Sequence, residues 1–202
     1  MPTVSRLAAD SVMFELRPDG GARWLRPGGP VQAGTLAELA RCGAQRWIWL
    51  LAGQAVQVAA VELPAARPAV QLQALPFVRE DQLLGPLDEL AIAHRRLGRT
   101  SFLVALTQRA ALLAQYERLR GAGIRPGACI PELCAIPVAD GEWTLAIVGE
   151  QGWLDCGARG SFSFPATEWP AFLETALSCA SPPLRLRVLG SGASPAELAS
   201  RH

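Results

Sequence analysis

Hydrophobic and polar positions follow one another in short blocks along most of the chain, and the spacing inside each block predicts its structure. Blocks that alternate at every second residue, or that are short, apolar and bounded by turn residues, indicate β-strands. The predicted strands are 12–16, 22–25, 46–51, 55–63, 90–94, 101–106, 143–148, 152–156, 161–164 and 184–189. Strands are therefore expected from one end of the chain to the other.

Helices are predicted where apolar residues recur three or four positions apart behind a capping residue. Thr35-x-x-Glu38 is a capping box that opens a short helix before Gly43. The stretch 67–85 has a helical composition, but Pro76 removes one backbone donor and should divide it into two short helices.

Further helices are predicted behind other hydroxyl side chains. Thr107 should cap a helix that reaches Arg120 and buries one apolar face. The residues of that face are Leu112, Leu113, Tyr116 and Leu119. Thr167 should cap a helix over 168–179, and Ser194 should begin a last helix near the end of the chain.

The order of the predicted elements repeats along the chain. Hairpin strands, a helix and a further strand at 11–63 recur at 143–190, which suggests two related lobes with a smaller unit between them. The Pro- and Cys-containing stretch 124–137 is predicted to cross between the lobes. We therefore expect a mixed α/β fold. Its predicted units are residues 1–66, 67–137 and 138–202.

Charge and hydropathy change this picture by excluding several classes of protein. Nineteen Lys and Arg residues balance 18 Asp and Glu residues, so the net charge is +1 and nucleic-acid binding is not expected. Half of the residues (50%) are apolar, which is enough for a globular core. The longest uncharged stretch, 47–61, has 15 residues, fewer than the ~20 that a membrane-spanning helix needs. The polar first ten residues do not resemble a signal peptide.

Residues that commonly perform catalysis or bind metals are scarce. The five cysteines are widely spread and contain no C-x-x-C pair, which favours buried thiols in a reduced cytosol. The only histidines are His94 and His202, too few to complete a zinc site. Neither a P-loop nor a G-x-S-x-G nucleophile elbow occurs. We therefore predict no catalytic, cofactor-binding or metal-binding residue and no enzyme activity.

A nucleotide site is the strongest alternative that the sequence offers. Asp155-Cys156-Gly157 has the form of a phosphate-binding hairpin turn, and glycines follow the last predicted strand at 190–193. A phosphate chain with its magnesium needs a second such turn in the first lobe. Asp10-Ser11-Val12 lacks the glycine, and Asp19-Gly20-Gly21 lies in the turn itself. We therefore interpret Asp155 as part of a structural turn.

The six tryptophans suggest core packing more than binding. Trp47 and Trp49 share one strand face and should both point inward. Trp153 and Trp169 stand beside a turn or a helix start and are the better candidates for exposure. An exposed tryptophan would be a candidate anchor for a protein partner.

The run Gln71 to Leu83, QLQALPFVREDQL, resembles the characteristic motif of the type II secretion system L proteins. These proteins typically have Leu-Pro-Phe followed two residues later by an acidic pair and glutamine, and then a short acidic stretch, here 88–89. The flanking stretches 47–51 and 119–126 also resemble the family. One departure is that Ala91 stands where members often have histidine, with His94 displaced.

The resemblance implies an actin-like fold with ribonuclease-H-type lobes at 1–66 and 138–202. It also implies a noncatalytic scaffold at the cytoplasmic face of the bacterial inner membrane. The implied partners are the amino-terminal domain of the secretion ATPase (protein E), protein M and the other platform proteins, and a second copy of the chain. No small-molecule substrate is implied. Members continue into a transmembrane helix and a periplasmic domain, so we expect the soluble part of such a protein or a shortened member.

The candidate partner-binding residues are Arg79, Glu80, Asp81 and Gln82, which lie at the most diagnostic point of the motif. Adjacent helical side chains point about 100° apart, so the two carboxylates cannot easily converge on one reacting atom. Two interpretations remain open, a solvated helix surface and charged recognition of a protein. The alternative functions are an actin-like ATP-binding protein and a pilus-assembly adaptor of the same fold.

Overall fold

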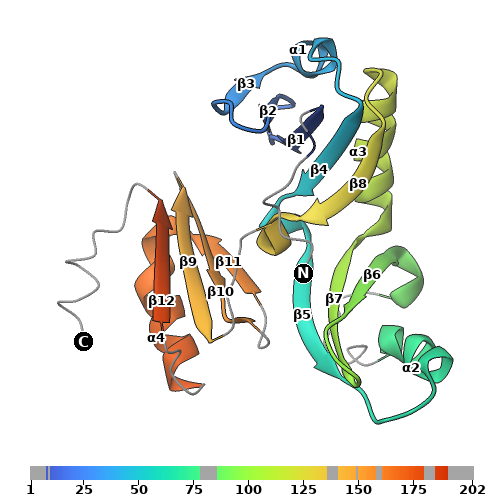
Figure 1. Ribbon diagram of the computed structural model, residues 1–202, viewed down its shortest axis with the longest axis vertical. Coiled ribbons are helices and arrows are strands. Elements are labelled where there is room, and N and C mark those ends of the chain that lie inside the picture. Colours follow the sequence, from blue (N-terminus) through green and yellow to red (C-terminus); the bar gives the residue numbers. More distant parts are fainter. Residues whose placement is uncertain are drawn as a thin grey trace.

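A computed structural model shows the chain as three β-sheets with helices packed against them (Figure 1). The structure describes residues 8, 10–77, 86–135, 141–148, 150–157, 161–179 and 185–190. Sheet A has five strands, sheet B three and sheet C four. The mixed α/β prediction is therefore confirmed.

Sheet A forms the first lobe and has the strand order β3-β2-β1-β4-β8. The strands β1, β2 and β3 pair antiparallel, whereas β4 and β8 are added in parallel. Their bounds are β1 (Ser11–Leu16), β2 (Ala22–Leu25), β3 (Gln32–Gly34), β4 (Arg46–Leu51) and β8 (Pro126–Pro131). The helices of this lobe are α1 (Leu36–Arg41) and α3 (Arg109–Gly121). The predicted capping box is confirmed, because Thr35 and Glu38 exchange the expected hydrogen bonds at the start of α1.

Sheet C forms the second lobe and repeats the arrangement of the first. Its order β11-β10-β9-β12 matches β3-β2-β1-β4, with two antiparallel pairs followed by a parallel one. The elements are β9 (Glu142–Val148), β10 (Gln151–Asp155), β11 (Ser161–Pro165), α4 (Trp169–Ser178) and β12 (Arg185–Gly190). The predicted repeat of element order is therefore confirmed by the strand pairing.

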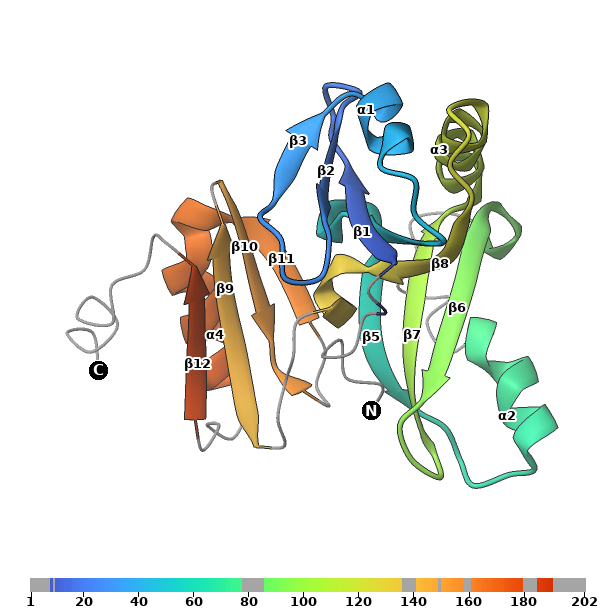
Figure 2. The same ribbon diagram turned by 45° about the horizontal axis from the view of Figure 1, so that its top comes forward.

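Sheet B is an antiparallel sheet of β5 (Gln57–Glu62), β7 (Ser101–Gln108) and β6 (Leu90–Arg96), in that order. Helix α2 (Pro68–Ala74) covers one face and ends in a 3₁₀ turn, η3 (Leu75–Phe77). A second 3₁₀ turn, η5 (Leu87–Glu89), leads into β6. Pro76 lies in η3, so the predicted interruption of the helix at this proline is confirmed. Figure 2 shows α2 beside the strands of sheet B. The second short helix predicted after Pro76 falls on 78–85, which lie outside the described residues.

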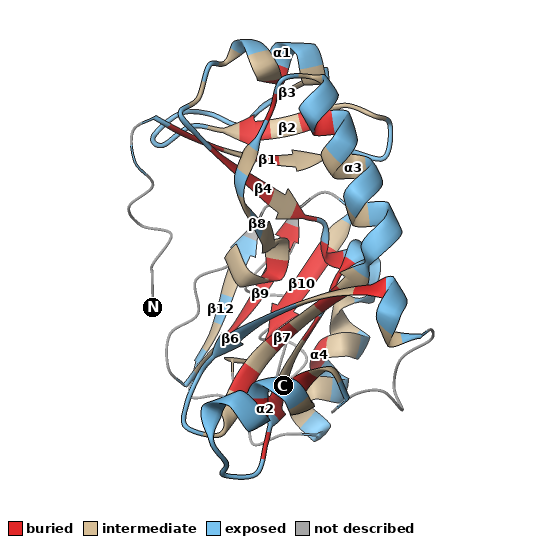
Figure 3. Cartoon of the chain, turned by 90° about the vertical axis from the view of Figure 1, so that its right-hand side faces the viewer, coloured by how far each residue is buried: buried red, intermediate tan, exposed pale blue. Residues whose placement is uncertain are grey.

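Buried residues form three clusters that follow the three sheets (Figure 3). Trp47 and Trp49 are both buried in the first cluster, as predicted. Trp153 also belongs to this cluster, although it comes from sheet C, and it is only 5% exposed. The prediction that Trp153 is exposed was therefore wrong, because the first lobe covers it. Trp169 is partly buried against the second-lobe cluster.

Other sequence predictions fail for local physical reasons. Thr107 does not cap α3; it lies in β7, and its hydroxyl donates a hydrogen bond to the Ala55 carbonyl oxygen at 2.6 Å. Thr167 lies in a 3₁₀ turn, η8 (Ala166–Glu168), and gives α4 no side-chain cap. Leu113 was expected to be buried, but it is 53% exposed.

The stretch 124–137 is not merely a crossing. Residues 126–131 form β8, and residues 132–135 form the 3₁₀ turn η6 (Glu132–Ala135). Because β8 pairs with β4, this segment is part of sheet A. The division into units at residues 66 and 137 stays a prediction, and the predicted helix at Ser194 lies outside the described residues.

Candidate functional site

The predicted partner-binding residues Arg79, Glu80, Asp81 and Gln82 lie outside the described residues. The helix that leads to them, α2, is fully described and begins the same motif. The structure therefore shows how the first part of the motif, in α2 and η3, is attached to the rest of the molecule.

Gln71 attaches α2 to sheet B. Its side chain is only 3% exposed, and its Nε2 donates hydrogen bonds to the carbonyl oxygens of Pro64 (3.1 Å) and Arg99 (3.4 Å). Its Oε1 accepts a hydrogen bond from Arg96 at 2.6 Å. The Arg96 guanidinium also lies 4.9 Å from the centre of the Phe102 ring. A buried amide that is satisfied on both ends fixes the helix in one orientation.

Three apolar side chains of α2 and η3 are exposed, in contrast to the buried polar side chain of Gln71. Val70 is 53% exposed, Leu72 42% and Phe77 61%. Val70 and Leu72 are two positions apart in the helix and point to different sides, so the three residues are separate apolar points that a protein partner can cover and not one face.

The Asp155 turn, which a nucleotide site would use, is occupied by its own hydrogen bonds. Asp155 Oδ1 accepts from the Gly157 N–H at 2.7 Å, and Oδ2 accepts from the Ser161 hydroxyl at 3.0 Å. Burial raises the pKa of the Asp155 carboxyl, and these hydrogen bonds and the charge of Arg95 lower it in part. The carboxylate therefore closes the hairpin between β10 and β11, as the structural interpretation predicts.

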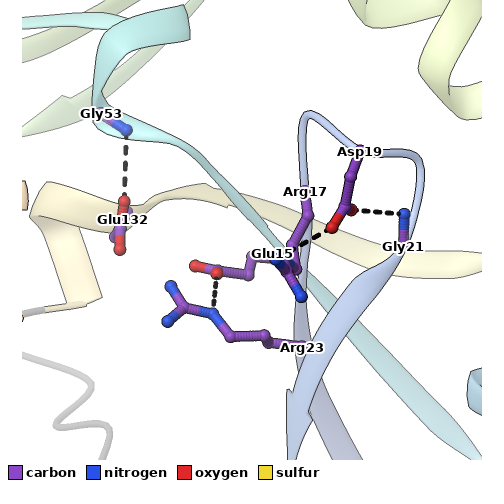
Figure 4. A network of polar contacts seen from close by, with 7 residues as sticks. All are labelled: Glu15, Arg17, Asp19, Gly21, Arg23, Gly53 and Glu132. Carbon is purple, nitrogen blue, oxygen red and sulfur yellow. Dashed lines mark hydrogen bonds and ion pairs between the residues drawn. The ribbon is translucent and has the colours of Figure 1, made fainter. Parts of the chain in front are cut away.

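The first lobe has a turn of the same chemistry at a different place. Asp19 Oδ1 accepts from the Gly21 N–H at 2.9 Å, and Asp19 Oδ2 lies 2.9 Å from Arg17 Nη2 (Figure 4). This turn joins β1 to β2, whereas Asp155 is in the turn that joins β10 to β11. By strand order, β10–β11 corresponds to β2–β3, so the two turns lie at opposite ends of the strands in equivalent sheets. They do not form a matched pair around one ligand.

The contact between the two lobes is close at Gly53. A Cβ added to Gly53 would lie 2.9 Å from the Cβ of Ser163 and 3.1 Å from Trp153 Nε1, so only glycine fits without a shift. Gly53 N–H donates to the Glu132 carboxylate at 3.3 Å (Figure 4). A hydrogen bond from Gln54 to Gln151 also joins the lobes.

Glu132 is a partly buried carboxylate at this contact. Burial is the main reason that its pKa is raised, and the nearby charge of Glu15 raises it further. The Gly53 N–H, the charge of Arg23 and the Trp153 indole act in the opposite direction. Glu15 and Arg23 form an ion pair on the hairpin beside Glu132 (Figure 4). Although the Trp153 indole affects this carboxylate, its N–H forms no hydrogen bond of good geometry with any described residue.

A cavity of about 260 Å³ lies where sheets A and B meet. Its wall is mainly apolar and comes from β1, β6, β7, β8 and η6. The lining residues are Met13, Ala93, His94, Arg95, Leu103, Ala105, Cys129, Ile130, Pro131, Cys134 and Ala135. We call it the A/B cavity.

Two thiols line the A/B cavity, and both stay protonated at neutral pH. Burial raises the pKa of Cys129 to about 11 and also raises the pKa of Cys134. Within the described ranges, no group of three or more His, Cys, Asp or Glu side chains is placed to hold a metal ion. The cavity is therefore mainly apolar and suited to an apolar ligand group, with Arg95 as the charged residue of its lining.

Neither Glu132 nor the A/B cavity was predicted from the sequence. Both include residues of the stretch 124–137, which the prolines marked as a connection. The alternation of half-buried and exposed positions in β8 was the available signal, but the alternation spans only six residues. Among the described residues, no helix is long and apolar enough to span a membrane.

Comparison with protein families gives a match over most of the chain. Residues 19–187 match the family model described as type II secretion system (T2SS), protein L. A curated relative, type II secretion system protein L of Dickeya chrysanthemi, is 30% identical over 94 residues, which is 46% of this chain. The same stretch covers only 23% of that relative's length.

The solved structures that share the fold include two from bacterial assembly systems. The cytoplasmic domain of EpsL, described as an inner membrane component of the type II secretion system of Vibrio cholerae, matches with a TM-score of 0.74 and 19% identity, covering 91% of this chain and 83% of that one. A chain of the PilM–PilN type IV pilus biogenesis complex matches with a TM-score of 0.62 and 14% identity, covering 95% and 84%. These likenesses confirm the predicted actin-like fold.

Proposed function

This chain belongs to the type II secretion system protein L family, and we propose that it serves there as a noncatalytic scaffold that recruits the secretion ATPase. The observation that supports a scaffold best is that the carboxylates of the two Asp-x-Gly turns form hydrogen bonds within the turns themselves. Each carboxylate accepts a hydrogen bond within its own turn, and the two turns join strand pairs that are not equivalent in the two lobes. The actin-like body thus keeps its architecture while the described groups that would hold a phosphate chain serve structural turns.

Contacts between the three sheets support the scaffold proposal. The three sheets are joined through buried contacts, because Val58 of sheet B and Trp153 of sheet C both pack in the first-lobe core. A surface presented by such a body has little conformational freedom to lose on binding. This favours a role in docking.

We place the ATPase contact at the outer side of α2 and at residues 79–82. Exposed Val70, Leu72 and Phe77 supply apolar area, and the charged residues that follow them in sequence would set the register of the partner. The proposed partner is the amino-terminal domain of the secretion ATPase, protein E of the system. Protein M, other platform proteins and a second copy of this chain are further proposed partners.

The proposed location is the cytoplasmic face of the inner membrane. EpsL, whose cytoplasmic domain has the same fold, is described as an inner membrane component. A second candidate function, a pilus-assembly adaptor, is supported by the likeness to a chain of the PilM–PilN complex. The family match over residues 19–187 favours the secretion scaffold over the adaptor.

The direct test is co-purification with the amino-terminal domain of the cognate secretion ATPase. We expect a stable complex. The double variant Glu80→Lys/Asp81→Lys should weaken it by about tenfold or more, because charge reversal at a recognition surface replaces attraction with repulsion. The matched control is Asp88→Lys/Glu89→Lys, which reverses two exposed carboxylates outside the proposed contact. Equal loss in both variants would contradict the placement, and no complex with the unaltered chain would contradict the partner.

Calorimetry with ATP and Mg²⁺ tests the noncatalytic part of the proposal. We expect no binding at micromolar concentrations. Magnesium-dependent binding in that range would contradict the noncatalytic scaffold and support an actin-like ATP-binding protein.

A further inference from the structure

We propose that the A/B cavity is a docking site for an extended peptide segment of a partner protein. The segment adds to β6 as a further strand and places a large aliphatic side chain in the cavity, next to a carboxylate that pairs with Arg95. This goes beyond the ATPase contact proposed above, because the cavity lies on the other face of sheet B from α2.

Within the described parts of the chain, the cavity lies between two strand edges that pair with no further strand. β6 is the last strand of sheet B and β8 is the last strand of sheet A. Three consecutive residues of each strand line the cavity, 93–95 of β6 and 129–131 of β8. Consecutive residues of a strand point to opposite faces, so the wall at these places includes the backbone edge. An edge with free N–H and C=O groups is a template for an added strand.

The side chains of β6 separate into two sets. Ala93 pairs with Ala105 and Arg95 with Leu103, and all four line the cavity. His94 lies between them, and its ring is edge-on to Phe102 at 6.4 Å between centroids. Because Phe102 belongs to the cluster under α2, His94 borders the cavity through its backbone. A strand added here would therefore meet an apolar face and a hydrogen-bonding edge together.

The size and chemistry of the cavity define the group that enters it. Small side chains at Ala93 and Ala105 leave the space open, and Met13, Leu103 and Ile130 make it apolar. A cavity of about 150 Å³ holds a benzene-sized group, and small-molecule sites begin near 300 Å³. At about 260 Å³ the A/B cavity fits one large aliphatic side chain, or two smaller ones, better than a cofactor.

Arg95 favours a peptide that carries a negative charge. Arg95 lines the cavity and is exposed, and it forms neither a hydrogen bond nor an ion pair with any residue that the structure describes. The charge of Arg95 also lowers the pKa values of Cys134 and Asp155, so its field reaches into this region. A carboxylate two positions from the aliphatic side chain would lie on the same face of the added strand and reach Arg95.

The test starts from phage-displayed random decapeptides selected on the purified chain, followed by fluorescence anisotropy with the enriched peptide in synthetic form. We expect Leu, Ile or Met two positions from Asp or Glu among the enriched sequences. Ala93→Leu fills the cavity and should raise the Kd by about tenfold or more, and Arg95→Glu should do the same by repulsion. The matched controls are Ala91→Leu, one pleat away on the same face, and Arg99→Glu in the nearby turn. Both should stay within about twofold.

Backbone pairing is tested with N-methylated versions of the same peptide. Methyl groups on the alternate residues whose N–H groups face β6 should abolish binding, whereas methyl groups on the other residues should have little effect. Equal effects of the two sets, no enrichment, or Ala93→Leu binding as well as the unaltered chain would each overturn the proposal. The ATPase co-purification has its own readout, so either proposal can fail while the other stands.

Discussion

The two lobes share one strand order but differ in what they present to each other. The first lobe brings polar groups to the contact: the Glu15–Arg23 ion pair, Glu132 and the Gly53 N–H. The second lobe brings Trp153 and Ala146, which are buried in the core of the first. Equivalent topology therefore does not make equivalent surfaces. The backbone arrangement is repeated in the two lobes, while the side chains at their contact differ and join the lobes to each other.

The largest expected effect is a loss of stability in the second-lobe core, and it tests whether the two lobes unfold together. Leu154 is fully buried in the second-lobe cluster, and Leu154→Ala should lower the free energy of unfolding by about 2–5 kcal/mol through lost burial and a cavity. If the lobe contact makes one cooperative unit, urea unfolding followed by far-UV circular dichroism and by tryptophan fluorescence should shift together. Leu189→Ala, at an exposed position, is the control and should change stability by less than about 0.5 kcal/mol. Separate transitions in the variant would show that the lobes unfold independently.

A smaller effect is expected at the contact itself. Gly53→Ala should cost about 1–3 kcal/mol, because the new methyl group meets Ser163 and Trp153 at less than contact distance. Gly98→Ala is the control, since its added Cβ would meet Ser101 only at ordinary contact distances of 3.6 and 3.8 Å. A red shift of tryptophan emission in Gly53→Ala would show that Trp153 has become solvated. An unchanged melting temperature would contradict the close contact.

The helices of the two lobes should respond differently to the loss of a threonine. Thr35→Ala removes a side-chain cap from α1 and should cost about 1 kcal/mol. Thr167→Ala removes none from α4 and should cost less than about 0.5 kcal/mol. Thermal unfolding of both variants tests this, and equal losses would contradict the difference in capping.

The smallest expected effect is a pH dependence at the lobe contact. Because the pKa of Glu132 is raised in the folded chain, the folded state holds a proton to higher pH than the unfolded chain does. Stability is therefore lost as pH rises from the ordinary value of 4.5 through the folded pKa. Glu132→Gln keeps an acceptor for Gly53 and should flatten this part of the stability profile. Glu174→Gln, at an exposed position on α4, should leave the slope unchanged.

Local patterns predicted the elements whose causes lie within a few residues. The capping box at Thr35, the interruption at Pro76 and the alternating strands of both lobes are of this kind. β8 was missed because Pro126 and Pro131 read as loop residues, yet both stand at the ends of a strand that pairs on one side only. β3, with three residues, is too short for periodicity to mark.

The sites depend on contacts between distant segments, which one sequence does not show. The A/B cavity needs residues of β1, β6, β7 and β8, and the burial of Trp153 needs the other lobe. The motif residues 79–82 were found only because the run resembles a family, and their role stays a proposal. Composition and spacing alone indicated a noncatalytic globular protein and nothing about its partner.

Gln71 shows how one short motif can combine two different demands. The first residue of QLQALPFVREDQL holds α2 against sheet B, while the charged residues near its end are proposed to meet another protein. In a pull-down screen, Gln71→Ala and a change at Glu80 would look alike, since both would reduce capture of the partner. Limited proteolysis would tell them apart, because only the Gln71 variant should expose the segment around α2 to cleavage. Sequence identity along this run therefore records folding and recognition together, and a variant has to be assayed for both before its loss is assigned to either.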